Sequence, residues 1–195
     1  MNNTSTLTKK IIAGKFKGKS LKLPSKETTR SSKMIVVESF FNTLQFDVME
    51  SIFVEVFSGS GSIGLEALSR GAKKVIFMEK DKEAIKVLRS NIAQTDPSGC
   101  EVVEGNSFIT IAEVKKRLER LGEGAFIYID PPFSIREGME GIYDQTLAMI
   151  ASLTLNTVHL IAIEHMSGLE LPENIGVFNR IKSKKFGKTT LSYYA

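Results

Sequence analysis

The feature that most constrains this sequence is a unit that repeats along its middle, in which a short apolar run is followed by a turn and a helical pattern. The apolar runs cover residues 51–57, 74–80, 101–105, 126–130 and 158–165. Helical patterns follow near residues 62–71, 82–94, 107–121 and 138–151. Because strands that alternate with helices form a parallel sheet covered on both faces, the sequence predicts an α/β fold.

The two ends of the chain depart from this alternation. Residues 10–23 place isolated apolar residues among lysines, with two glycines as turn points, which is typical of a short basic hairpin. Residues 30–44 have the apolar spacing of a helix. Near the other end, residues 177–187 and 189–194 predict two antiparallel strands joined through Gly187.

Length and composition bound the class of protein. The 195 residues suffice for one domain and a small appendage, which we place at residues 30–195 and 1–29. No apolar run reaches the ~20 residues that span a bilayer, and the N-terminus lacks the apolar segment of a secretory signal. We therefore expect a cytoplasmic protein with no membrane partner. One cysteine and two histidines argue against an internal disulfide and a structural metal.

The net charge of +4 conceals two basic ends around an acidic middle. Residues 1–33 sum to +8 and residues 178–195 to +5, which leaves −9 between them. If both ends fold onto one face, they form a positive surface that suits nucleic acid, because neutralised phosphates release counterions. Solvated tails are the alternative. The basic residues that we expect at RNA are Lys15, Lys17, Lys19, Arg30, Lys184, Lys185 and Lys188.

A glycine-rich turn follows the first strand of the alternating unit. Gly59, Gly61 and Gly64 form a G-x-G-x-x-G pattern that opens a helical segment. Glu79 ends the next strand, 20 residues after Gly59. Glycines let the backbone approach a ligand closely, and a carboxylate at that place accepts the hydroxyls of a ribose. These residues predict a nucleoside-bearing cofactor, either a dinucleotide or S-adenosylmethionine.

The choice between these cofactors depends on Asp130-Pro131-Pro132-Phe133, at the end of the fourth apolar run. Prolines hold a turn rigid and leave carbonyl groups outside the strand ladder, so the Asp130 carboxylate and the Pro131 carbonyl can accept both hydrogens of one NH₂ group. Phe133 offers a flat apolar surface on which a base stacks. We expect this turn to hold a nucleobase amine for methylation, with no metal. A strand terminator without chemistry is the alternative.

On these residues the sequence resembles the bacterial small-subunit (16S) ribosomal RNA guanine-N2 methyltransferases of the D type. The resemblance spans nearly the whole chain and rests on IIAGKFKGKSLKL near the N-terminus, the glycine run from Phe57 to Gly71, Asn106, the DPPF turn and FGKT near the end. It implies a class I S-adenosylmethionine-dependent methyltransferase fold, with a Rossmann-like, mostly parallel sheet of seven strands that ends in an antiparallel hairpin. It also implies S-adenosylmethionine as methyl donor, S-adenosylhomocysteine as product, and a guanine of ribosomal RNA, within the small subunit particle, as acceptor.

The resemblance further implies roles for individual positions. The glycines would face the methionine part of the cofactor, Glu79 the ribose and Asn106 the adenine amine. The turn would hold the target guanine, so the expected catalytic residues are Asp130, Pro131, Pro132 and Phe133. The residues expected at the cofactor are Glu55, Phe57, Gly59, Ser60, Gly61, Glu79, Lys80, Asn106, Ser107, Phe108 and Asp130.

Three places depart from the family pattern. Glu55 stands where the family usually has aspartate, and we expect its longer side chain near the cofactor's ammonium group. Arg30-Ser31-Ser32 replaces Arg-Pro-Thr, and Val37 replaces an arginine beside Glu38, which changes the side chains that face RNA there. Glu38 is either a carboxylate that orients a ligand or one that faces solvent.

Other functions stay open on the sequence alone. An acidic-Pro-Pro-aromatic turn can also serve DNA adenine or a protein amine, a nicotinamide oxidoreductase can use the same glycine loop, and a non-catalytic RNA-binding assembly factor needs only the charge. We expect structural roles for His165, Cys100, Tyr193 and Tyr194. A monomer is the default oligomeric state.

Overall fold

The computed structural model describes residues 7–24, 31–132 and 141–195. Its strands are β1 (Thr8–Lys10), β2 (Ser20–Lys22), β3 (Ile52–Val56), β4 (Lys74–Glu79), β5 (Cys100–Glu104), β6 (Ala125–Ile129), β7 (Val158–Met166), β8 (Asn174–Ile175), β9 (Phe178–Phe186) and β10 (Thr189–Tyr194). Its helices are α1 (Ser31–Leu44), α2 (Ser62–Ser69), α3 (Lys82–Ile92), α4 (Ser107–Leu121) and α5 (Ile142–Ala151), with a 3-10 turn at Pro97–Gly99.

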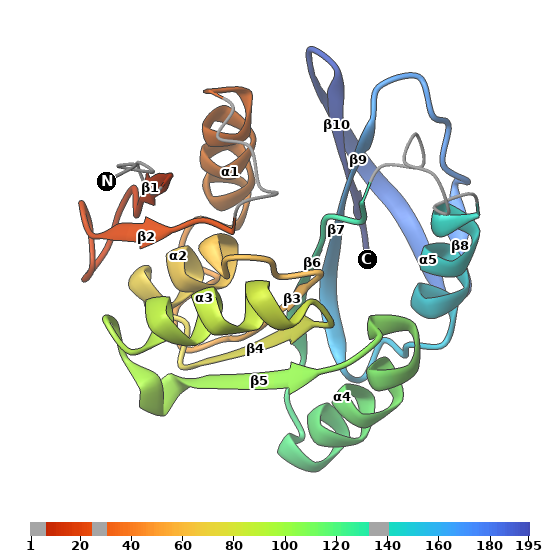
Figure 1. Ribbon diagram of the computed structural model, residues 1–195. Helices are drawn as coiled ribbons and strands as arrows, with labels where there is room; N and C mark the ends of the chain where they lie inside the picture. Colours follow the sequence, from red (N-terminus) through yellow and green to blue (C-terminus); the bar gives the residue numbers. More distant parts are fainter. Residues whose placement is uncertain (1–6, 25–30, 133–140) are drawn as a thin grey trace.

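One mixed sheet organises the fold, with strands in the order β5-β4-β3-β6-β7-β10-β9-β8 (Figure 1). Strands β5 to β7 in that order are parallel, and β10, β9 and β8 continue the sheet antiparallel. The predicted Rossmann-like sheet and its C-terminal hairpin are confirmed. The described sheet has one strand more than predicted, because Asn174 and Ile175 pair with β9.

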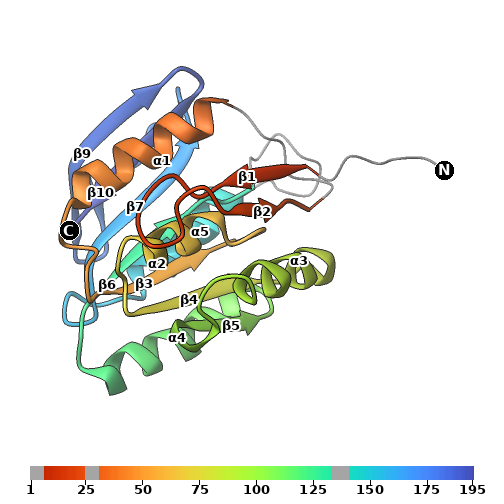
Figure 2. The same cartoon turned by 90° about the vertical axis from the view of Figure 1, so that its left-hand side faces the viewer.

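Helices cover both faces of the sheet, which explains why its central strands read as continuous apolar runs. Every residue of β3 and β6 is buried. Helices α1, α2 and α3 lie on one face and α4 and α5 on the other (Figures 1 and 2). On the α1 side, the Phe40 ring packs edge-on against Tyr128 and Phe53, with centroids 4.9 and 6.0 Å apart. On the other side, Val54 and Ile127 share a core with residues of α4 and α5.

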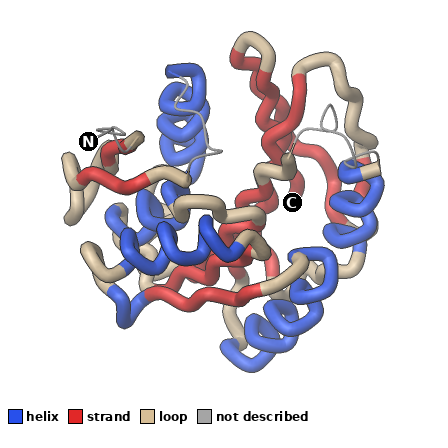
Figure 3. The backbone as a smooth tube through the Cα atoms, viewed as in Figure 1, coloured by secondary structure: helices blue, strands red, loops and turns tan. Residues whose placement is uncertain are grey.

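The basic N-terminal segment forms the predicted hairpin, in which β1 pairs antiparallel with β2. The hairpin is separate from the main sheet but lies against α2 (Figure 3). The side chains of Ile11 and Leu21 belong to the same core as the sheet residues Phe53 and Phe77. The segment is therefore packed onto the domain. The predicted boundary at residues 29 and 30 falls outside the described residues, so the division into two regions stays a prediction.

Helix α2 holds the hairpin through side chains that its own sequence supplies. The Glu66 carboxylate, 2% exposed, accepts hydrogen bonds from the backbone amides of Ile12 (2.7 Å) and Ala13 (3.1 Å). Ser69 accepts a hydrogen bond from the Phe16 amide at 2.9 Å. Gly14 lies so close that a Cβ atom there would be 1.8 Å from the Ser69 carbonyl oxygen. A side chain at this position would collide with that carbonyl group, and the φ of +80° at Gly14 also disfavours other residues. Only glycine therefore fits here.

Among residues 7–24, 31–132 and 141–195, no helix is long and apolar enough to cross a membrane. Within the same residues, no cluster of three or more histidine, cysteine, aspartate or glutamate side chains could hold a metal ion.

Candidate active site

The candidate site lies where the parallel strands end. Val56, the last residue of β3, pairs with Met78 of β4 on one side and with Ile129 of β6 on the other. The glycine turn, Glu79 and Asp130 therefore follow neighbouring strands at one edge of the sheet. The strand order changes direction between β3 and β6, and ligands bind at such switch points in open α/β sheets. Tertiary structure thus brings together the two motifs that the sequence analysis singled out.

The glycine turn is shaped by packing against β4 and α3. Gly61 has φ +77°, and a Cβ atom there would lie 2.3 Å from a methyl carbon of Leu88. A Cβ atom on Gly64 would lie 2.5 Å from the Phe77 ring. Both glycines are thus required by contacts within the protein. The glycine pattern alone is weaker evidence for a ligand than the position of the turn.

Two residues of this region are buried behind the turn. Ser60 is fully buried, and its expected place at a cofactor stays a prediction. The Glu55 side chain, 4% exposed, reaches the first turn of α2. Its carboxylate accepts the backbone amides of Ile63 at 3.2 Å and Gly64 at 2.8 Å. A carboxylate stabilises the positive end of a helix dipole, so Glu55 positions α2, and its expected contact with the cofactor's ammonium group stays a prediction.

Glu79 ties the end of β4 to the glycine turn. One carboxylate oxygen accepts the Gly59 amide at 2.7 Å. The other accepts the amides of Lys80 and Asp81, both at 2.8 Å. A carboxylate offers about four lone-pair positions, so three amides leave capacity for about one further donor. The side chain is 9% exposed, at the place where the sequence predicted a ribose contact.

An aromatic pair stands at the same edge. The rings of Phe57 and Phe108 meet edge to face, with centroids 5.5 Å apart, and both side chains are partly buried. Phe57 has φ +60°, an uncommon backbone conformation for a residue with a side chain, and such strain clusters at functional sites. Asn106 is exposed and accepts the Phe108 amide at 3.1 Å, which caps α4. Ser107 is buried, whereas the Lys80 side chain is exposed.

Asp130 follows β6 directly and is partly exposed, with Pro131 buried and Pro132 partly exposed. Burial, and after it the charges of Glu164 and Asp130, raises the pKa of Tyr128 well above its ordinary value. Asp130 is therefore on the α1 side of the sheet, the side on which Tyr128 and Glu55 also lie. Phe133 and Arg30 lie outside the described residues, so the predicted stacking and RNA contacts there stay predictions.

Sequence analysis missed a second carboxylate beside Asp130. Ile163 of β7 pairs with Ile129 of β6, so Glu164 occupies the next position along, next to Asp130. Glu164 is 3% exposed and accepts the Tyr128 hydroxyl at 2.8 Å. The sequence signal for this residue was a glutamate within the apolar run 158–165. Buried strands rarely carry a charged residue without a partner, so a glutamate there indicates a specific contact.

The predicted RNA contacts fall into two groups. Ser69 ends α2 at the edge of the sheet opposite the candidate site, and it holds the tip of the N-terminal hairpin. Two of the three lysines there have neighbours in the protein: Lys15 is 4.0 Å from the Asp96 carboxylate, and Lys19 donates to the Gln94 carbonyl. Lys15, Lys17 and Lys19 therefore lie away from Asp130. A single RNA-binding face would need them at the same edge of the sheet as Asp130.

The second group lies at the site edge. Thr189, which begins β10, pairs with Met166, the last residue of β7. Met166 is two residues beyond Glu164, which lies level with Asp130, so the β9–β10 turn projects past Asp130 by about 7 Å at strand spacing. The turn carries the exposed side chains of Lys185 and Lys188, and Lys184 donates to the Ser39 hydroxyl at 3.1 Å.

The structure shows where Val37 and Glu38 of α1 lie. Val37 is 3% exposed and belongs to the core, so this position offers no side chain to RNA. Glu38 is exposed, as expected for the solvent-facing alternative.

His165, Tyr193 and Tyr194 have the structural roles that the sequence predicted. His165 is 3% exposed, and its Nε2 lies 2.8 Å from the Ser192 hydroxyl. Burial lowers the pKa of His165, so the ring is neutral near pH 7. Both tyrosines are fully buried strand residues.

Cys100 is expected to be unreactive in the folded protein. Burial, reinforced by the charge of Asp96, raises the pKa of its thiol to about 12. At pH 8 a thiol with this pKa is about one part in ten thousand thiolate, the form that reacts. Iodoacetamide at pH 8 should therefore leave Cys100 unmodified over an hour and label it promptly in urea, as measured by mass spectrometry. Equal labelling with and without urea would contradict this placement.

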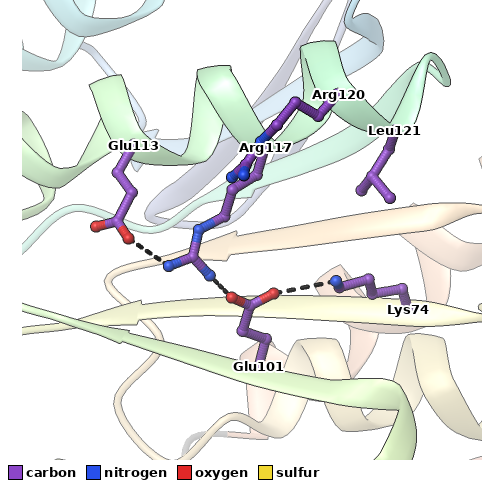
Figure 4. A pocket seen from close by; sticks show the side chains of 6 residues that line it. All are labelled: Lys74, Glu101, Glu113, Arg117, Arg120 and Leu121. Carbon is purple, nitrogen blue, oxygen red and sulfur yellow. Dashed lines mark hydrogen bonds and ion pairs between the residues drawn. The ribbon is translucent and has the colours of Figure 1, made fainter.

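A cavity of about 380 Å³ lies elsewhere, between α4 and the first residues of β4 and β5 (Figure 4). Its lining is charged, and Glu101 pairs with both Lys74 (3.1 Å) and Arg117. Lys74 begins β4, so this cavity lies at the sheet edge opposite the glycine turn. Three basic and two acidic side chains line this cavity, and it has no part in the candidate site.

Comparisons with known proteins show similarity in sequence and in fold. A family model described as "Conserved hypothetical protein 95" matches residues 9–195. The chain is 30% identical over 190 residues to "Ribosomal RNA small subunit methyltransferase D" of Haemophilus influenzae, covering 95% of this chain and 92% of the relative. A solved structure from Thermus thermophilus, titled as a hypothetical protein, is 27% identical with a TM-score of 0.70 and covers 94% of this chain and 97% of its own.

A more distant structure shows the same fold. It is titled as an RNA methyltransferase from Salinibacter ruber in complex with S-adenosyl-L-homocysteine. Its identity to this chain is 16%, its TM-score is 0.54, and it covers 86% of this chain and 92% of its own. At this identity the likeness concerns architecture alone.

Proposed function

The chain belongs to the family described as conserved hypothetical protein 95, and on that premise we propose that it is a ribosomal RNA methyltransferase. We assign it the transfer of a methyl group from S-adenosylmethionine to the exocyclic N2 amine of a guanine in small-subunit ribosomal RNA. The observation that carries this proposal is the position of Asp130-Pro131-Pro132 directly beside the glycine turn and Glu79, at one edge of the sheet. The name of the Haemophilus influenzae relative supports the substrate class.

The residues at this edge fit S-adenosylmethionine. Glu79 retains capacity for about one ribose hydroxyl beside the Gly59 amide. The partly buried rings of Phe57 and Phe108 offer an apolar surface beside Asn106, which suits a flat adenine. When bound, the cofactor supplies a methyl group on a positively charged sulfur atom. We place no metal in the reaction.

Asp130 would act on the acceptor. The lone pair of a guanine N2 amine is delocalised into the ring, which makes the amine a poor nucleophile. The Asp130 carboxylate and the Pro131 carbonyl would accept its two hydrogens, favour the pyramidal amine and align nitrogen with the methyl carbon. The amine would gain the methyl group that the bound cofactor supplies, and Asp130 or water would take the proton that the amine loses. Phe133 would stack on the base, which must leave its helix to reach the site.

RNA contacts are expected mainly from the β9–β10 turn. Replacing Lys184, Lys185 and Lys188 together with alanine should flatten the dependence of RNA affinity on salt, because each lost phosphate contact removes about 0.7–0.9 from the logarithmic slope. The matched triple variant at Lys15, Lys17 and Lys19 should change the slope less, because those lysines lie at the opposite edge. Filter binding at salt concentrations from about 50 to about 300 mM measures the slope for each triple variant. A larger effect of the hairpin variant would reverse the assignment.

The decisive test of the function uses labelled methyl donor. The protein is incubated with tritiated S-adenosylmethionine and small ribosomal subunits that lack the modification, beside DNA and protein substrates. Label in the RNA, mapped to one guanine by nuclease digestion and mass spectrometry, is the expected result. Label in DNA adenine or in protein would favour the alternative amine methyltransferases, and RNA binding without label would favour an assembly factor. We expect the enzyme to act as a cytoplasmic monomer on the subunit particle.

A further inference from the structure

A buried asparagine joins the N-terminal hairpin to the glycine turn. Asn91, near the end of α3, is fully buried. Its side-chain Nδ2 donates to the carbonyl of Lys22 in β2 and to the carbonyl of Ser60 in the turn, each at 2.9 Å. Its Oδ1 accepts the Lys22 amide at 2.9 Å. One side chain thus satisfies backbone groups of two segments that are far apart in the sequence.

The chemistry of this position is specific to an amide. The two carbonyls require two donor hydrogens from one group, and the Lys22 amide requires an acceptor on the same side chain. Aspartate has no donor, and a hydroxyl has only one. Because buried polar groups that lose their partners are costly, the contact fixes the turn and the hairpin together. Lys22 is also exposed, so the hairpin residue bonded to Asn91 presents a cation to solvent.

A second contact joins the same two segments. Lys9 of β1 donates to the Ser62 hydroxyl at the start of α2, at 3.2 Å. Ser60 and Ser62 flank Gly61, so the open end of the hairpin contacts the turn on both sides of that glycine. By contrast, the tip of the hairpin contacts α2 farther from the glycine turn, through the side chains of Glu66 and Ser69. The hairpin is thus attached at two separate places, of which one touches the turn.

We infer that Asn91 is a positioning residue that makes the docked hairpin part of the cofactor site. This inference rests on the proposed function, since it takes the turn as the cofactor's. Cofactor binding and docking of the hairpin's open end against the glycine turn are then linked, and the linkage is reciprocal: contacts that hold this end at the turn tighten the cofactor, and the cofactor tightens these contacts. RNA that contacts the hairpin would raise cofactor affinity by the same route.

The test compares two alanine variants that release the hairpin at different places. Asn91→Ala removes the contact at the turn, and Ser69→Ala removes the contact at the tip, where Ser69 is also buried. Calorimetric titration with S-adenosylhomocysteine should show affinity weakened on the order of ten-fold in Asn91→Ala. Affinity in Ser69→Ala should stay within about two-fold, the scatter expected for independent sites. Thermal unfolding of both variants reports how far each loses stability.

Hydrogen exchange supplies a readout that a general loss of stability would not give. In the wild type, S-adenosylhomocysteine should slow exchange of the Lys22 amide, which is bonded to Asn91. In Asn91→Ala the ligand should no longer affect that amide. If Asn91→Ala fails to fold, Lys22→Pro removes the same bond from the hairpin side and should weaken the ligand in the same direction.

Three results would overturn the inference. Equal weakening in the Asn91 and Ser69 variants would assign Asn91 to stability alone. Unchanged affinity in both Asn91→Ala and Lys22→Pro would remove the link to the cofactor. A wild-type protein that does not bind S-adenosylhomocysteine would refute the proposed cofactor and the inference with it, and this outcome is distinct because it needs no variant.

Discussion

Replacing Asp130 with alanine is expected to abolish methyl transfer while leaving affinity for S-adenosylhomocysteine nearly unchanged. The carboxylate would hold the acceptor amine and take its proton, and positioned acid–base groups contribute about 10²–10⁴-fold to rate. Glu79 and the glycine turn, which would hold the cofactor, lie on neighbouring strands. Asp130 is partly exposed at the end of β6, so the fold should tolerate the change.

Single-turnover methylation of small ribosomal subunits measures the rate, and titration with S-adenosylhomocysteine measures the affinity. Asp144→Ala is a matched control, because Asp144 is an exposed aspartate in the first turn of α5. It should retain the wild-type rate. Full turnover by Asp130→Ala would remove Asp130 from the mechanism, and a large loss of cofactor affinity would show that it serves the cofactor instead of the base.

Replacing Glu79 with alanine is expected to weaken S-adenosylhomocysteine by about 10- to 150-fold, because hydrogen bonds to a charged group contribute about 1.5–3 kcal/mol. The structure gives two reasons for this loss. The carboxylate has capacity for a ribose hydroxyl, and it also holds the Gly59 amide of the turn at 2.7 Å. Turnover at saturating methyl donor should recover most of the wild-type rate, since Glu79 does not touch the acceptor base.

Glu104→Ala is the matched control for Glu79. Glu104 pairs with Glu79 in the sheet register and ends the neighbouring strand β5. It is half exposed and pairs with Arg89 at the surface, where ion pairs contribute little. Its replacement should leave affinity unchanged. Comparable losses in both variants would indicate that the effect is one of charge at this edge, without a specific ribose contact.

Most of the fold could be predicted because its signals are local. Apolar runs and helical spacing placed the elements from α1 to β7 to within a few residues of their observed bounds, and two segments joined through Gly187 without a helix gave β9 and β10. The α5 segment was predicted from residue 138, and its described part begins at Ile142. The two-residue strand β8 was missed, because Asn174 and Ile175 carry no pattern and pair only through the neighbouring β9.

The candidate site was predicted in part. Glu79 and Asp130 were found because they follow apolar runs, and parallel strands end at one edge. The hydrogen bonds of Glu55 to α2 and of Ser60 to α3 could not be predicted, because they depend on where these helices pack. Glu164 and Asn91 went unnoticed, since each acts on residues more than 30 positions away in the chain. The hairpin lysines were assigned by charge, which carries no information about the edge at which they lie.

The sequence by itself determined the α/β architecture, the closing hairpin and the two turns that carry the candidate chemistry, because periodicity and turn residues act over a few positions. Tertiary structure alone decided that Glu55 caps a helix and that Glu79 and Asp130 come together at one edge of the sheet. It also decided that the basic hairpin packs on α2 with its tip away from Asp130. These outcomes follow from contacts between distant segments, and their energies depend on burial and geometry that no local pattern of residues encodes.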